Sequence, residues 1–65
     1  MANDYFVIVD GSVTPAESAQ EVAKALIRAR SNNQDARFLV RGTTAEREAE
    51  GREMVEAWLR ELSPT

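Results

Sequence analysis

The sequence carries the same short pattern twice, and this repetition constrains the fold more than any other feature. Residues 6–11 form an apolar run that ends in Asp-Gly, and residues 37–42 form a shorter run that ends in Arg-Gly. At least one threonine and a glutamate follow each glycine, and a stretch with apolar residues at helical spacing comes next. Each half is therefore interpreted as a strand, a glycine turn and a capped helix. This predicts the α/β class, as a small βαβα unit.

Four elements are predicted, namely strands over residues 4–10 and 36–41 and helices over residues 15–31 and 44–62. Both helices are expected to begin with a capping box, in which a threonine and a glutamate three residues later satisfy free backbone N–H groups. The two boxes are Thr14 with Glu17 and Thr43 with Glu46.

Apolar residues at helical spacing predict which face of each helix is buried. In the first helix the stripe consists of Ala19, Val22, Ala23, Leu26 and Ala29, with Ile27 at its edge. In the second helix it consists of Val55, Trp58, Leu59 and Leu62, with Met54 beside it and Gly51 on it. A glycine inside a helix costs about 1 kcal/mol relative to alanine, so close packing is expected at that position.

A connection through one helix predicts that the two strands are parallel. Two parallel strands make an exceptionally small sheet, and a single domain over residues 1–65 is short of buried surface. The chain has no cysteine for a disulfide and no histidine for a metal. We therefore expect a homodimer, in which the second copy either extends the sheet or stacks on its uncovered face.

Charge and hydropathy exclude several classes of partner. A net charge of -3 disfavours nucleic acid, which requires a basic face. Because no apolar run could span a membrane and the N-terminus lacks a signal pattern, we expect a cytoplasmic protein. A nucleophile such as Ser12 has no histidine or cysteine to activate it, so we expect no enzymatic activity, no metal and no cofactor.

One edge of the predicted parallel sheet is a candidate anion site. Ligands of open α/β sheets bind beyond the carboxyl ends of the strands, where helix N-termini offer free N–H groups. The candidate residues are Gly11, Ser12, Thr14, Arg41, Gly42, Thr43 and Thr44. Tight turns and helix caps explain the same residues without a ligand, and Asp10 disfavours an anion.

Part of this edge resembles the phosphate loop of flavodoxin-like domains, which reads Ser/Thr-x-Thr-Gly-x-Thr. Ser12 and Thr14 match two of its hydroxyl positions. Pro15 stands where that family has glycine, and Glu17 stands at the last hydroxyl position. A glutamate there would repel a phosphate, so the resemblance implies no flavin site in this chain.

Three functions remain open at this point. The leading expectation is a small binding or regulatory protein that acts through protein–protein interaction as a homodimer, with its partner unknown. Its interface candidates are Gly51, Met54, Val55 and Trp58, where glycine would let a partner backbone approach closely; the ordinary interpretation of Trp58 is a core residue. The alternatives are a designed α/β scaffold without biological function and a weak anion- or nucleotide-binding module.

Overall fold

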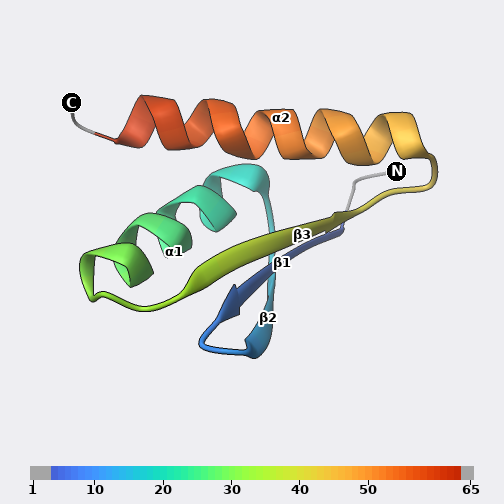
Figure 1. The fold of residues 1–65 in the computed structure, drawn as a ribbon. Helices are drawn as coiled ribbons and strands as arrows, with labels where there is room; N and C mark the ends of the chain where they lie inside the picture. The colour runs from blue at the N-terminus through green and yellow to red at the C-terminus, as the bar shows by residue number, and fades with distance from the viewer. Residues whose placement is uncertain (1–3, 64–65) are drawn as a thin grey trace.

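The computed structural model describes residues 4–63, which form a three-stranded sheet and two helices (Figure 1). The elements are β1 (Asp4–Val9), β2 (Ser12–Ala16), α1 (Ala19–Ser31), β3 (Ala36–Arg41) and α2 (Ala45–Leu62). The strand order is β2-β1-β3, and β1 is antiparallel to both neighbours. The predicted α/β class is confirmed. The predicted βαβα unit with two parallel strands is wrong.

A tight turn after β1 is the reason for the difference. Asp10 and Gly11 have φ values of 50° and 86°, both in the left-handed region, as a two-residue type I′ hairpin turn requires. Val9 and Ser12 face each other directly across this turn. The chain therefore reverses after β1 and returns as β2, where the sequence pattern predicted the start of a helix.

Because β2 is an edge strand, it accommodates Pro15. Hydrogen-bonded and non-hydrogen-bonded pairs alternate along an antiparallel pair of strands. In a two-residue hairpin the pair that closes the turn, here Val9 and Ser12, is a hydrogen-bonded one. Pro15, opposite Phe6, falls on a non-hydrogen-bonded pair, so its missing N–H belongs to the outer side of the strand. A proline on the outer side also weakens this edge as a template for another strand.

α1 begins four residues later than predicted. Ser18 is its N-cap, and the Ser18 hydroxyl accepts a hydrogen bond from the backbone N–H of Glu21 at 3.3 Å. The predicted box at Thr14 and Glu17 is wrong, because Thr14 lies in β2 opposite Val7. Ser18 and Glu21 have the spacing of a capping box themselves, so the signal was present four residues further along.

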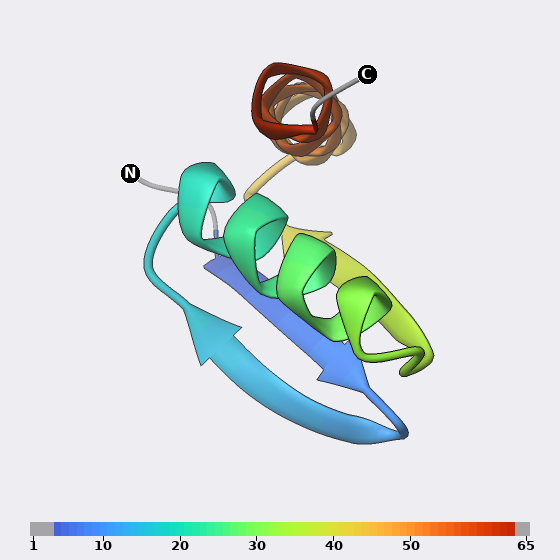
Figure 2. The same cartoon turned by 90° about the vertical axis from the view of Figure 1, so that its left-hand side faces the viewer.

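Both helices lie on the same side of the sheet. β2 and β3 run in the same direction with β1 between them, and α1 connects them across one sheet face (Figure 2). α2 packs against α1 and β3, and in Figure 2 it is seen end-on beside the β3 edge while α1 runs across the sheet. The core therefore lies between α1, α2 and one face of the sheet.

The predicted stripe of α1 is confirmed, since every residue of it is buried. The core contains Tyr5, Val7, Ala19, Val22, Ala23, Leu26, Ala29, Ala36, Val40 and Val55. Leu26, Val22 and Val55 are its largest fully buried side chains. Trp58 and Leu59 of α2 are half-buried and pack against this core.

The start of α2 is one residue later than predicted. Its N-cap is Thr44, whose hydroxyl accepts from the backbone N–H of Arg47 at 3.2 Å, and not Thr43. Gly51 is buried, as expected for close packing of the helix at this position.

Candidate functional site

The second face of the sheet is an apolar surface that no described element covers. Side chains alternate between the two faces of a strand. Tyr5 and Val7 of β1 are buried on the helix side, so Phe6 and Ile8 lie on the opposite side. Figure 2 shows that neither helix crosses that side.

The register of the sheet brings further apolar residues to the same face. Phe6 is flanked by Pro15 of β2 and Leu39 of β3, and Ile8 is flanked by Val13 of β2. Val13 is 61% exposed and Leu39 is 47% exposed, which is high for large apolar side chains. We call these five residues, Phe6, Ile8, Val13, Pro15 and Leu39, the open face.

Charged residues border the open face. Arg37 and Arg41 alternate with Leu39 along β3, and Arg41 lies opposite Asp4 in the register. Arg37 pairs with Asp35 at 3.8 Å, but both side chains are well exposed, so this ion pair contributes little to stability. An apolar centre with a charged rim is the usual composition of a protein–protein interface.

The predicted interface residues of α2 divide into two groups. Gly51 and Val55 are buried within the protomer, and Val55 belongs to its core. Met54 is 52% exposed, and Met54, Ala57, Trp58 and Glu61 line a shallow hollow of about 260 Å³ on the surface of α2. Of the four predicted interface residues, only Met54 and Trp58 are therefore accessible to a partner.

The predicted anion residues do not form one site. Gly11 and Ser12 lie at the hairpin end of the sheet, whereas Arg41 lies opposite Asp4 at the other end. Their partners in β1, Val9 and Asp4, are five positions apart, which is about 17 Å along a strand. Thr14 lies within β2, at neither end.

Beyond β3, two of the three residues expected to hold an anion already have partners inside the chain. The backbone N–H of Gly42 donates to Glu48 Oε2 at 3.2 Å, and Thr44 caps α2. A carboxylate thus occupies the position that an anion would need. The neighbouring Thr43 is exposed.

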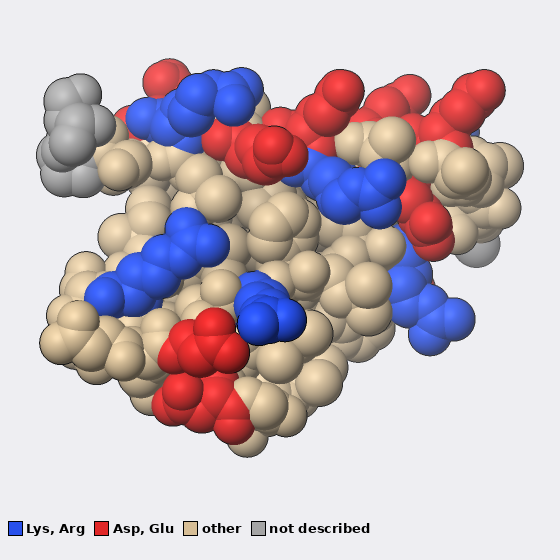
Figure 3. Space-filling view, in the orientation of Figure 1, with Lys and Arg blue, Asp and Glu red and all other residues tan. Residues whose placement is uncertain are grey.

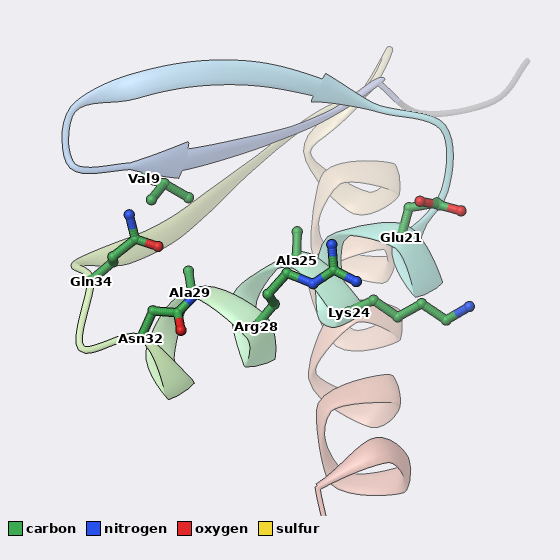
Figure 4. Close-up of a pocket in the computed structure, with 8 residues that line it drawn as sticks. All are labelled: Val9, Glu21, Lys24, Ala25, Arg28, Ala29, Asn32 and Gln34. Carbon is green, nitrogen blue, oxygen red and sulfur yellow. The ribbon is translucent and has the colours of Figure 1, made fainter.

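A groove also runs between α1 and the β1–β2 hairpin (Figure 4). Its volume is about 350 Å³, and its lining residues are Val9, Glu21, Lys24, Ala25, Arg28, Ala29, Asn32 and Gln34. Its charged side chains, Glu21, Lys24 and Arg28, are all exposed and carry both signs. Such a lining is typical of a solvated helix face and indicates no particular ligand.

Within residues 4–63, no three acidic, histidine or cysteine side chains gather where a metal ion could be held. Neither helix in this part of the chain has the length and hydropathy needed to cross a membrane. The features of the described residues that point to a function are therefore the exposed apolar and charged surfaces. No family model, curated protein or solved structure matches it.

Proposed function

We propose that the chain is a small non-enzymatic binding protein that acts as a homodimer, with a second copy covering the open face. The observation that supports this is the uncovered apolar centre of the sheet, where Phe6 and Ile8 lie between Val13, Pro15 and Leu39. A domain of this size buries a smaller share of its surface than a larger one does, and association with a second copy is one usual remedy.

The charges around the open face favour a copy of the same chain as the occupant. The β3 side carries Arg41, and Glu17 directly follows the last residue of β2, Ala16, which pairs with Tyr5. Two sheets that stack face to face keep their strands nearly aligned. A twofold axis along the strands then places β3 of one copy over β2 of the other. Arg41 of one copy meets Glu17 of the other, and the two Phe6 rings meet at the centre.

The size of the open face predicts a weak dimer. Three strands about 4.8 Å apart and five residues about 3.4 Å apart give a footprint of roughly 14 by 17 Å. This footprint is clearly smaller than the area of about 800 Å² that each partner buries in a standard interface. We therefore expect an equilibrium between monomer and dimer that depends on protein concentration.

Sedimentation equilibrium over a wide range of protein concentration tests the proposal. Leu39→Glu places a charge within the open face, beside Phe6, and should keep the protein monomeric where the unmodified chain is dimeric. Met54→Glu is the matched control, because Met54 is similarly exposed but lies on α2. This variant should dimerise like the unmodified chain.

Two results would contradict the proposal. An unmodified chain that stays monomeric up to millimolar concentration has no homodimer to explain. A dimer that Met54→Glu disrupts and Leu39→Glu leaves intact is formed through α2 and not through the sheet.

A further inference from the structure

The net negative charge of this protein arises from one helix, α2. α2 contains six glutamates and three arginines, a net charge of -3, which equals the net charge of the whole chain. The remainder of the molecule is therefore balanced. Figure 3 shows acidic side chains along α2. A partner that binds this helix is expected to be basic.

Three of these glutamates border the shallow hollow on α2. Residues four apart are neighbours on a helix surface, so Glu50, Met54 and Trp58 form one ridge. Glu53, Ala57 and Glu61 form the adjacent ridge. Met54, Ala57 and Trp58 thus lie between acidic residues at both ends, and Glu61 itself lines the hollow. We call these six residues the α2 patch.

Of the apolar residues in the α2 patch, Trp58 packs partly against the core of its own protomer, whereas Met54 and Ala57 do not belong to that core. The side of α2 that contacts the core carries Gly51 and Val55, both buried. Met54 and Ala57 are exposed, and Trp58 is only half-buried. Two cations border the patch by helical spacing, Arg60 next to Ala57 and Arg47 next to Glu50. The three glutamates of the patch still leave an excess of negative charge around its apolar centre.

We propose that the α2 patch binds a basic amphipathic helix of another protein. Ridges of residues four apart on α2 offer grooves into which the side chains of a second helix fit. Tryptophan and methionine are enriched at interfaces, and they would contact the apolar stripe of the partner. Lysine or arginine beside that stripe would meet Glu50, Glu53 and Glu61. This proposal is independent of the homodimer, since the open face lies on the opposite side of the sheet from the helices.

A synthetic peptide is the probe. It has about 16 residues, enough for four helical turns, with leucine at the apolar positions of one face and lysine elsewhere. Trp58 is the only tryptophan of the chain, so its fluorescence reports on the α2 patch directly. We expect a saturable blue shift on titration. A peptide with glutamate in place of every lysine should cause no shift.

Variants separate the α2 patch from general attraction between opposite charges. Met54→Glu should weaken peptide binding at least about tenfold, as expected for an apolar anchor at an interface. Glu61→Gln should weaken it about threefold and reduce its dependence on salt. Glu56→Gln is the matched control, because it removes the same charge from the other side of α2, and the affinity should stay unchanged.

Each remaining outcome would overturn the proposal. No fluorescence change at millimolar lysine peptide shows that the patch does not bind a basic helix. Equal binding of the glutamate peptide shows that charge plays no part. If Glu56→Gln and Glu61→Gln reduce the affinity for the peptide equally, the peptide is attracted to the whole acidic helix and not to a site. An unchanged affinity of Met54→Glu leads to the same conclusion.

Discussion

The hairpin turn at Asp10 and Gly11 offers the sharpest test of the fold. The test compares an L-residue with a D-residue at position 11. Gly11 has a φ of 86°, and a Cβ built there meets no atom within 4 Å. An alanine at this position is therefore free of clashes, and its effect on stability comes from the backbone conformation alone. L-alanine disfavours this region, whereas D-alanine prefers it.

Two opposing effects set the size of the change. An L-residue in the left-handed region costs roughly 1–2 kcal/mol. Replacing glycine also restricts the unfolded chain, which stabilises the folded state by about 0.4–1 kcal/mol. Gly11→Ala should therefore lower the free energy of unfolding by about 0.5–1.5 kcal/mol. D-alanine at the same position keeps only the second effect, so it should raise the free energy of unfolding by about 0.4–1 kcal/mol.

Thermal or urea unfolding of the three synthetic chains, followed by circular dichroism at one low protein concentration, measures these differences. For a domain of this size, 1 kcal/mol corresponds to a Tm shift of about 4–8 °C. The D-alanine chain should have the highest Tm, glycine an intermediate one and L-alanine the lowest. Equal stability of the two alanine chains, or a more stable L-form, would refute the assignment of a left-handed turn.

Two further predictions concern the cap of α1 and the core, and both use unfolding at the same low concentration. Ser18→Ala removes the N-cap hydrogen bond and should cost about 0.5–2 kcal/mol, whereas Thr14→Ala on the exposed edge strand should cost less than about 0.5 kcal/mol. The reverse order would mean that the helix begins near Thr14. Leu26→Ala, at a side chain with 0% exposure, should cost about 2–5 kcal/mol, and Leu39→Ala, which is half exposed, clearly less. Similar losses for the two leucines would place Leu39 in the core of the monomer.

Sequence patterns predicted the elements that rely on local signals. The strand over residues 36–41 has the observed bounds, and the second helix differs from the observed one at its first residue only. The apolar stripe of α1 was predicted residue by residue, because burial of one helix face leaves a period that survives in the sequence. These features depend on nearby residues and not on how distant segments pair.

β2 could not be recognised by the same means. Ser12, Val13 and Thr14 form a strand because β1 lies beside them. Pro15 is compatible with the first position of a helix and also with an edge strand, so it does not decide between the two. One local signal was available, since Asp-Gly after an apolar run is the strongest short indication of a hairpin. The similarity of the two halves of the chain favoured a parallel pair and obscured it.

The same error placed the candidate site wrongly in space. With parallel strands, both glycine turns would share one edge of the sheet and could hold an anion together. With antiparallel strands, Gly11 and Gly42 lie at opposite ends. An uncovered side of the sheet could be anticipated from the sequence. The residues that form it could not, because they depend on the register of β2 and β3 with β1.

Contacts between two copies of the chain test the homodimer most directly. A sample that mixes isotope-labelled and unlabelled protein at millimolar concentration yields nuclear Overhauser effects that arise only between copies. The account predicts such effects between the Phe6 ring and the methyl groups of Leu39 and Val13. Effects confined to Met54 and Trp58, or none at this concentration, would contradict it.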